Sequence, residues 1–567
     1  MKIIGYDILR KKNGGCCMKK LAKSVEDFKE LVDECYFIDK TGLLKDLHAE
    51  KVVLYTRPRR FGKTLNMSMI EYFYNVKEKD NAYLFHGLEI SKHKEVMEEQ
   101  NKYPVISITF KGMKQFNFEE QMNDFKEIIA KILRKYSELK KSDKLEDKEK
   151  VKLESYEDGN INLAQLGRAL EFISECLQKH YNEKVIILID EYDVPLQHAY
   201  LYGYYDEMVN LMRNVLSAAL KTNKALKRGI LTGCLRIAKE SIFTGLNNFS
   251  VYGISEEISS QYFGFTPEEV KQILKDYNLL AYEEDVKTWY DGYMFGKQEM
   301  YNPWSIIQYV YQASRTSNKK PLSFWANTSG NDIVMQYITH GDSQMRQDFD
   351  TLMNKKSIVK EIKPELTYRE MDNLNNIYSF LLFTGYLKIV EVVDIVNDRY
   401  ELKIPNEEVR KVYRNQFNEY FKEVKQAERP IFIQAMLDGN LEKIKKVLNK
   451  ILSVSVSYYD NKESFYHGFL VGMFQGIDGY TVISNKESGE GRFDIVLLPD
   501  DIDQKAIIIE CKHVQSLRLL REAAKQGAVQ IQDKRYEEMV ENEGYESYIG
   551  YGISFCKKHC YVVKSDV

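Results

Sequence analysis

Short, continuous apolar runs rich in β-branched residues mark the first half of the chain. Val52–Tyr55 and Val185–Ile189 have the pattern of strands buried on both faces of a sheet. Tyr103–Phe110 and Arg228–Gly233 predict two more strands. Segments with helical periodicity separate these runs. Strands that alternate with helices predict an α/β domain with a parallel sheet.

The pattern changes twice further along the chain. Residues 254–315 predict helices, with Thr266–Glu269 as a helix start, and residues 331–450 predict mostly amphipathic helices. Near the C-terminus a helix around Glu463 to Phe474 precedes three strands and an amphipathic helix. The three strands are Tyr480–Ser484, Phe493–Leu498 and Ala506–Lys512. We therefore expect four regions: an α/β domain at 18–250, a helical lid at 251–340, a helical linker at 341–450 and a second α/β domain at 451–567.

Composition limits the classes of function. The 567 residues are too many for one core, and 81 basic and 84 acidic residues give a net charge of −3. Any basic binding surface must therefore be local. The eight cysteines form no paired Cys-x-x-Cys units, which makes a metal at Cys556–Cys560 the weaker interpretation. Without a membrane-length apolar run or a signal-type segment, we expect a cytoplasmic protein that starts at Met1 or Met18.

The stretch Arg57-Pro58-Arg59-Arg60-Phe61-Gly62-Lys63-Thr64 lies between the first predicted strand and a helix. This context is typical of a phosphate-binding loop, because backbone N–H groups at a helix start attract phosphate oxygens. Lys63 is then expected to reach the β- and γ-phosphates, and Thr64 to bind Mg²⁺. Arg57 stands where the general motif has its first glycine. Its side chain, with Arg59 and Arg60, could add phosphate contacts.

Asp190 and Glu191 follow the most apolar strand. An NTPase needs two such carboxylates, one to hold Mg²⁺ through its waters and one to orient the attacking water. The alternative is a core strand that ends in a solvated acidic turn, but the loop upstream favours the NTPase. Thr232 and Arg236 follow the fourth strand and are candidates to sense the γ-phosphate. A simple strand end is an equally good interpretation of these two.

A second set of chemical groups lies in the C-terminal region. Asp494 is on one strand, and Glu510 and Lys512 are at the end of the next. The two carboxylates could hold Mg²⁺ between the strands, and Lys512 shares a strand face with Glu510. Such a metal activates water and clamps a phosphodiester oxygen. The alternative is a pair of strands with charged, solvated ends.

Three further residues are candidates for this site. Glu463 could add a metal ligand or bind a water, and Gln530 could touch that water or the phosphate. Arg492 could contact the nucleic-acid backbone.

Taken in order, these motifs resemble a bacterial and archaeal family with an AAA-ATPase-like N-terminal domain and a C-terminal PD-(D/E)XK nuclease-like domain. The resemblance covers most of residues 19–540. It rests on Phe37–Thr41, Arg57–Thr64, Ile189–Asp193, Phe243–Asn248, Trp289–Tyr293, Tyr301–Pro303, Gly491–Asp494 and Glu510–Lys512.

The resemblance implies a P-loop NTPase sheet with a helical lid and a restriction-endonuclease-like fold. It implies ATP and Mg²⁺ as cofactors and a loop that begins with Arg57. At the nucleotide it implies Lys63, Thr64, Asp190 and Glu191, and at the nuclease metal Asp494, Glu510 and Lys512. The candidate loop positions also include Arg59, Arg60, Phe61 and Gly62.

Three functions fit the motifs. The first is an ATP-dependent DNA nuclease, of phage-defence or mobile-element type. The second is an ATP-driven switch or scaffold whose nuclease-like domain binds nucleic acid or a partner without cleavage. The third is a metal nuclease whose P-loop only binds nucleotide, against which Asp190 and Glu191 argue. A homo-oligomer is required if hydrolysis needs an arginine from a neighbouring subunit. No membrane partner is expected.

Overall fold

The computed structural model describes residues 20–237, 249–325, 343–455, 463–474, 479–484, 487–488, 491–492 and 494–565. The motif Phe243–Asn248 therefore lies outside the described residues, as do both candidate start residues. The chain divides into two compact units. Unit 1 comprises residues 1–327 and 357–409, and unit 2 comprises residues 328–356 and 410–567.

The centre of unit 1 is a five-stranded sheet in the order β2-β3-β4-β1-β5. All four neighbouring pairs are parallel, which confirms the predicted α/β class. β1 and β3 are buried, as their continuous apolar runs predict, and most of β4 is buried too. The strands are β1 Val52–Thr56, β2 Val105–Thr109, β3 Val185–Asp190, β4 Leu226–Gly233 and β5 Phe249–Tyr252.

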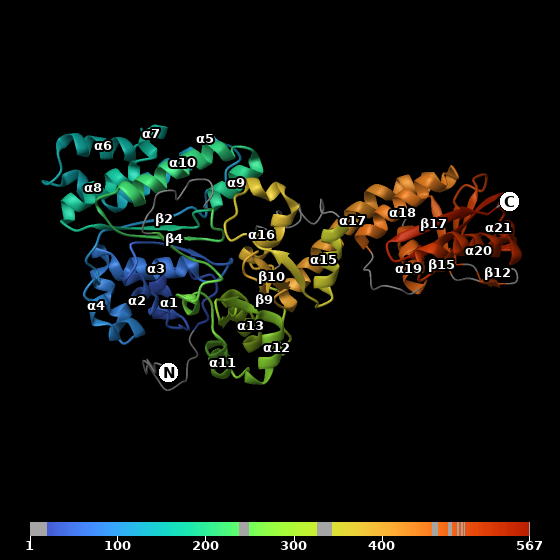
Figure 1. Cartoon of the computed structure of the whole chain (residues 1–567), viewed down its shortest axis with the longest axis horizontal. Helices are drawn as coiled ribbons and strands as arrows, with labels where there is room; N and C mark the ends of the chain where they lie inside the picture. Colours follow the sequence, from blue (N-terminus) through green and yellow to red (C-terminus); the bar gives the residue numbers. More distant parts are fainter. Residues whose placement is uncertain are drawn as a thin grey trace. The chain divides into compact units, whose positions relative to one another are not determined.

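Helices cover both faces of this sheet (Figure 1). One face carries α1 Phe28–Glu34, α2 Leu43–His48, α3 Lys63–Tyr74 and α4 Lys94–Met97. The other carries α5 Phe118–Lys135, α6 Asp147–Glu157, α7 Leu163–Leu166, α8 Ala169–Tyr181 and α10 Tyr205–Ser217. α9 Val194–Tyr202 follows the end of β3 directly. The carboxyl ends of β1, β3 and β4 thus lie at one edge of the sheet, where ligands of such sheets bind.

The segment after the sheet is mainly helical. It contains α11 Pro267–Asp276, α12 Glu283–Tyr290 and α13 Pro303–Arg315, and a hairpin of β6 Tyr293–Phe295 and β7 Gln298–Met300. The predicted helix start at Thr266 is confirmed, because its hydroxyl accepts the Glu269 N–H while Glu269 caps Thr266 in return.

The middle of the chain differs from the helical linker that the sequence predicted. β8 Ile358–Glu361, β9 Lys388–Asp394 and β10 Arg399–Lys403 form an antiparallel sheet in the order β8-β10-β9. The register of β9 against β10 shifts twice, and these irregularities remove the alternation that identifies a strand in a sequence. The helical elements here are α15 Ser343–Met353, α16 Ile377–Thr384 and α17 Glu407–Leu437.

Unit 2 contains a second five-stranded sheet, in the order β11-β14-β15-β16-β17. β15 pairs antiparallel with β14 and parallel with β16, so this sheet is mixed. The sequence predicted three of its strands and missed the last two. Its strands are β11 Tyr480–Ser484, β14 Ile495–Pro499, β15 Ala506–His513, β16 Tyr548–Cys556 and β17 His559–Lys564. The short strands β12 Glu487–Ser488 and β13 Gly491–Arg492 pair with each other.

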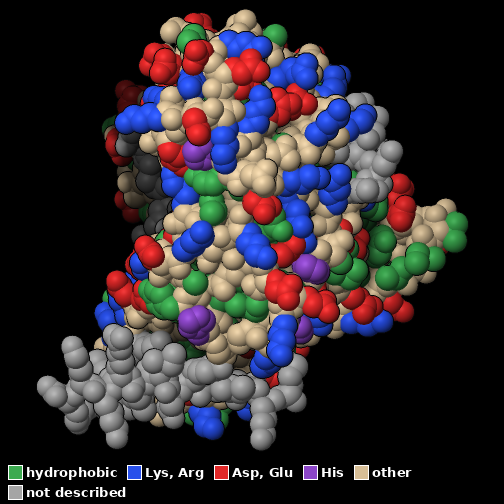
Figure 2. Space-filling model, turned by 90° about the vertical axis from the view of Figure 1, so that its left-hand side faces the viewer, with side chains coloured by type: hydrophobic (Ala, Val, Ile, Leu, Met, Phe, Trp, Pro, Cys, Tyr) green, Lys and Arg blue, Asp and Glu red, His purple; other side chains and the backbone are tan. Residues whose placement is uncertain are grey.

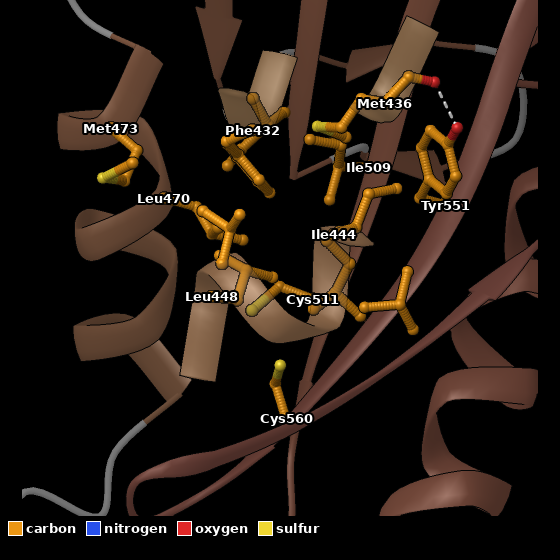
Figure 3. Close-up of a cluster of buried hydrophobic side chains, with 14 of the residues drawn as sticks. Phe432, Met436, Ile444, Leu448, Leu470, Met473, Ile509, Cys511, Tyr551 and Cys560 are labelled. Atoms are coloured by element: carbon orange, nitrogen blue, oxygen red, sulfur yellow. Dashed lines mark hydrogen bonds between the residues drawn. The ribbon is translucent and has the colours of Figure 1, made fainter. Parts of the chain in front are cut away.

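The two faces of this sheet have separate cores. Ile509 and Cys511 pack against α18 Leu441–Ser455 and α19 Glu463–Phe474 (Figure 3). Ile508 belongs to the opposite core, with residues of α20 Leu520–Asp533 and α21 Glu537–Asn542. Side chains of β15 therefore alternate between the two faces, and the even-numbered positions point to the α20 face.

Figure 2 shows lysine and arginine side chains interspersed with aspartate and glutamate on the end of unit 1 that carries α6 and α8. On this face, outside the grey atoms, neither sign of charge forms a continuous patch. Among the described residues, no helix combines the length and apolar character needed to cross a membrane.

Candidate functional site

The phosphate-loop candidate occupies a tight turn between β1 and α3. Gly62 precedes the helix with a φ of +79°, a conformation that glycine adopts without strain. Lys63 is buried, and its Nζ donates to the carbonyl oxygens of Arg57 at 2.9 Å and Pro58 at 3.0 Å. The ammonium group thus lies within the turn that the loop forms, beside the helix start.

Arg57 has a different environment from the one expected of a phosphate ligand. Its side chain is fully buried, and Nη1 donates to the carbonyl oxygens of Thr56, Tyr252 and Gly253. The guanidinium also lies over the rings of Phe263 and Phe295. Burial lowers the pKa of Arg57 to about 10. Nη1 of this guanidinium is thus bonded to protein carbonyls, and the phosphate contact of Arg57 stays a prediction.

Arg59, Arg60 and Phe61 anchor the loop to its surroundings. Arg59 Nη2 donates to Gln197 Oε1 on α9 at 3.2 Å. Arg60 donates to the Phe324 carbonyl at 3.1 Å and lies 4.4 Å from the Trp304 ring centroid. Phe61 is buried against the β6 aromatic rings. The side chains of Arg59 and Arg60 are only partly buried, whereas the side chain of Phe61 packs in the interior.

Asp190 lies at the centre of a polar cluster at the ends of β1, β3 and β4. Thr64 Oγ1 donates to Asp190 Oδ2 at 2.8 Å, and Thr232 Oγ1 donates to Asp190 Oδ1. The structure thus brings together three residues predicted from separate parts of the sequence. A hydroxyl and a carboxylate in contact at a helix start are suitable oxygen ligands for Mg²⁺ or its waters.

Glu191 follows Asp190 with a φ of +55°, a left-handed conformation that is uncommon for a non-glycine residue. Its N–H donates to Thr232 Oγ1 at 3.3 Å. Burial raises the pKa of Glu191, with a further contribution from Asp190, while Lys63 opposes the shift. A carboxylate with a raised pKa beside the loop is suited to take a proton from water.

Asp193 belongs to this edge but was not among the predicted site residues. Its buried Oδ2 accepts the backbone N–H groups of Cys234 at 2.8 Å and Leu235 at 3.0 Å. Burial raises the pKa of Asp193. Asp193 thus fixes the segment after β4 to the turn after β3. Its place in the motif Ile189–Asp193 was the only sequence signal for this role.

Arg236 lies beyond the end of β4 and pairs with Glu365, with 2.8 Å between Nη2 and Oε1. Both side chains are 37% exposed. The sequence proposed this arginine as a sensor of the γ-phosphate. The structure shows it in a surface ion pair, and such pairs contribute little to stability.

The second candidate site lies in unit 2, where β14 and β15 meet. The antiparallel register pairs Ile495 with Ile509 and brings Asp494 opposite Glu510. Asp494 Oδ2 accepts the Cys511 N–H at 2.7 Å. Lys512 Nζ lies 3.0 Å from Glu510 Oε1. The predicted grouping of Asp494, Glu510 and Lys512 is therefore present in the geometry.

Glu510 is 2% exposed, and burial, followed by the charge of Asp494, raises its pKa to about 7. Its Oε2 is buried and has no hydrogen-bond partner among the described residues. Two adjacent carboxylates and an unsatisfied buried oxygen fit a divalent cation, which would offset their repulsion. The described residues contain no group of three or more His, Cys, Asp or Glu suited to a metal. Any further ligands must come from water or substrate, or from side chains outside the described set.

Gln530 on α20 reaches this site, because its Nε2 donates to Glu510 Oε1 and lies 3.2 Å from the Tyr536 hydroxyl. The sequence predicted Gln530 but not His467, whose Nε2 lies 3.1 Å from the Asp494 carbonyl oxygen. The side chains of Glu463 and Arg492 lie outside the described set.

Two family models match the parts of the chain that contain the candidate sites. Residues 23–243 match the family model described as "Predicted AAA-ATPase", and residues 461–565 match that of the PD-(D/E)XK nuclease superfamily. An uncharacterized protein from the vnfD 5′ region of Azotobacter chroococcum is 23% identical over 406 residues, which cover 69% of this chain and 68% of that protein.

One solved structure is a signal transduction ATPase with numerous domains and a tetratricopeptide repeat sensor, from Pyrococcus horikoshii. The match has 12% identity and a TM-score of 0.23, and covers 82% of this chain. The chain spans 59% of that protein's length.

Proposed function

We propose that this chain, which joins an AAA-ATPase-like domain to a PD-(D/E)XK nuclease superfamily domain, hydrolyses ATP at the first site and cleaves DNA at the second. A role in phage defence or in a mobile element belongs to the same proposal. The ATPase part of the proposal rests on one observation: Thr64 and Thr232 contact Asp190, beside the loop that holds Lys63. This arrangement supports the proposal, because the groups suited to phosphate and to a cation lie at one edge of the sheet.

At the first site, the backbone N–H groups at the start of α3 and the Lys63 ammonium would bind the phosphates. Thr64 and Asp190 would hold Mg²⁺, which neutralises charge on the phosphates when it is bound. Glu191 would accept a proton from the attacking water, a role that its raised pKa supports. Thr232 would keep Asp190 in place through its hydroxyl.

At the second site, Asp494 and Glu510 would hold Mg²⁺. When bound, the ion lowers the pKa of a water and stabilises charge on a phosphodiester oxygen. Lys512 would orient the water or stabilise the developing charge, because its ammonium group already contacts Glu510. Gln530 would hold the Glu510 carboxylate from α20.

Substitution at the first site tests ATP turnover. We expect Lys63→Ala to lower the rate of phosphate release at least about 100-fold, because it removes the ammonium group that binds the phosphates. Glu191→Gln should lower turnover similarly but still bind a fluorescent ATP analogue. The matched control is Lys51→Ala, an exposed lysine just before β1. Unchanged turnover in Lys63→Ala would place the activity elsewhere.

Substitution at the second site tests cleavage. We expect Asp494→Ala to abolish Mg²⁺- or Mn²⁺-dependent cleavage of plasmid and single-stranded DNA, while ATP turnover persists. Asp503→Ala, an exposed aspartate of the same unit, is the matched control and should cleave as wild type does. If the purified wild-type chain cuts no nucleic acid with either metal, the nuclease proposal is wrong. ATP turnover alone would then favour a switch or scaffold.

A further inference from the structure

α18 is an amphipathic helix that covers one face of the sheet in unit 2. Figure 3 shows Ile444 and Leu448 of this helix among the buried side chains, close to Cys560. Because these positions face the core, the helical period directs Lys443, Lys446 and Lys450 to the other side. All three are exposed, and Lys450 pairs with Glu428.

A shallow hollow with a volume of about 540 Å³ opens on this outer side of α18. Among the described residues, its lining consists of Asn440, Glu442, Lys443, Lys445, Lys446 and Asn449. Three of these six residues are lysines and one is acidic. Asn449 is held in place, because its Oδ1 accepts the Cys560 N–H at 2.9 Å.

Residues of β17 and of the turn before α18 extend this basic surface. Lys564 lies next to the turn, since a Cβ placed on Gly439 would lie 3.8 Å from its Nζ. Lys445 Nζ lies 5.1 Å from the centroid of the Tyr561 ring. The acidic neighbours are Asp438, which accepts a hydrogen bond from Gln434, and Glu442 of the lining.

The charges around the hollow are unbalanced. Within the described residues, none of Lys443, Lys445, Lys446 and Lys564 has an ion pair, and these four cations outnumber the two acidic neighbours. The chain as a whole has almost equal numbers of basic and acidic residues. Its net charge of −3 therefore gives no sign of this local excess of lysines.

We infer that this hollow binds the phosphate backbone of a nucleic acid, without regard to sequence. Lysine ammonium groups are suited to phosphate oxygens as point charges, and the Asn449 amide can donate to the same oxygens. Nucleic acid is favoured over other polyanions because the hollow belongs to the unit that matches the nuclease superfamily. The inference thus rests on the proposal that this unit acts on nucleic acid.

The hollow and the cleavage site lie on different faces of one sheet. Cys511 points toward α18 and α19, whereas Glu510 contacts Gln530 on α20. The hollow would therefore hold a stretch of backbone other than the one at Asp494 and Glu510. The hollow would contribute to the affinity for nucleic acid, and the proposed chemistry at Asp494 and Glu510 does not depend on the hollow.

The salt dependence of DNA binding tests the inference. We would measure fluorescence anisotropy of a labelled duplex of about 30 base pairs and of a labelled single strand, with the full-length chain in EDTA, over a range of salt concentrations. For Lys443→Gln combined with Lys446→Gln, we expect duplex affinity to fall at least about tenfold at about 0.1 M salt. The slope of log affinity against log salt should become shallower by about two, because the variant lacks two lysines that each neutralise one phosphate in wild type.

The matched control combines Lys221→Gln and Lys224→Gln, which removes the same charge from exposed positions in unit 1. It should bind as wild type does. Equal affinity and slope in the α18 variant and wild type on both the duplex and the single strand would overturn the inference, as would an equal weakening in the control. A shallower slope on the single strand alone would support the hollow and assign it to single-stranded substrate.

Asp494→Ala separates this inference from the proposed cleavage. It should bind the duplex with the same salt slope as wild type, although it cannot cut. If wild type binds with a slope that depends on Lys443 and Lys446 but cuts no DNA, the hollow is supported while the cleavage proposal fails.

Discussion

Arg57, at the position of a motif glycine, contributes to the loop through its side chain. Its guanidinium donates to carbonyl oxygens at the end of β5 and lies over two aromatic rings. These contacts join the loop to the sheet edge strand, a function that a glycine cannot serve. A lysine is a poor substitute, because it lacks the flat guanidinium group that lies over Phe263 and Phe295.

Glu408 is a buried carboxylate whose ionisation opposes folding. It accepts hydrogen bonds from the Ser305 hydroxyl at 2.6 Å and from the N–H groups of Phe324 at 2.6 Å and Trp325 at 3.1 Å. Burial nevertheless raises its pKa to about 7. The folded state therefore binds a proton more tightly than the unfolded state does. This effect lowers the free energy of unfolding as pH rises from about 4.5 to about 7.

We expect Glu408→Gln to remove this pH dependence. Relative to wild type, the variant should gain about 3 kcal/mol in the free energy of unfolding between about pH 4.5 and about pH 7, since one pKa unit corresponds to about 1.36 kcal/mol. Urea denaturation followed by tryptophan fluorescence is the measurement. Trp289, Trp304 and Trp325 are the only tryptophans in the sequence and all lie in unit 1, so the signal reports that unit alone.

The control for this prediction is Glu361→Gln, an exposed glutamate on β8 of the same unit. Its stability should follow wild type at every pH. If the free energies of unfolding of Glu408→Gln and wild type differ by a constant amount across this pH range, the raised pKa of Glu408 is not the cause of the pH dependence.

Among the elements, α20 approaches its sheet closely enough to exclude a Cβ. A Cβ on Gly552 of β16 would lie 2.0 Å from the Ala524 carbonyl oxygen and 2.3 Å from the Ala528 nitrogen. Gly552 pairs with Glu510 in the parallel register. The short distance between helix and sheet therefore sets how Gln530 reaches the carboxylate.

We expect Gly552→Ala to force α20 away from the sheet and to destabilise unit 2 by about 1–3 kcal/mol, or more if the helix backbone cannot shift. Hydrogen–deuterium exchange of peptides from 520–533 should become faster. Gly112→Ala is the control, because a Cβ there meets open space. Unchanged exchange in α20 would show that the helix tolerates the methyl group.

The elements that the sequence predicted best are those buried on both faces. β1 and β3 were found because their apolar runs are continuous. The contact between Thr64 and Asp190 fits this arrangement, since the loop after β1 and the end of β3 lie at the same edge of a parallel sheet. β9 was missed because its bulges break the alternation, and four of its seven residues are exposed.

Side-chain direction was beyond sequence reasoning at several residues. Arg57 points into the protein interior, Arg236 pairs on the surface, and Asp193 fixes a backbone segment. Each of these results depends on neighbours from distant parts of the chain. Glu510 was placed correctly because period-2 alternation and antiparallel pairing leave little freedom.

At the scale of the whole molecule, the chain carries two sheets that share a class but not a topology. The sheet of unit 1 is parallel, and the sheet of unit 2 is mixed. The prediction of two α/β domains is confirmed at this level. The region between them in the sequence supplies β8, β9 and β10 to unit 1 and α15 to unit 2.

That shared region means that neither unit is a continuous stretch of chain. Unit 1 is completed only by residues 357–409, and by then the ribosome has already made the first portion of unit 2. During synthesis, α15 is therefore made before the rest of unit 2 and before unit 1 is complete. The carboxylates of the second candidate site, Asp494 and Glu510, emerge only after unit 1 is complete. A nascent chain would thus complete its first candidate site before the second one has been translated.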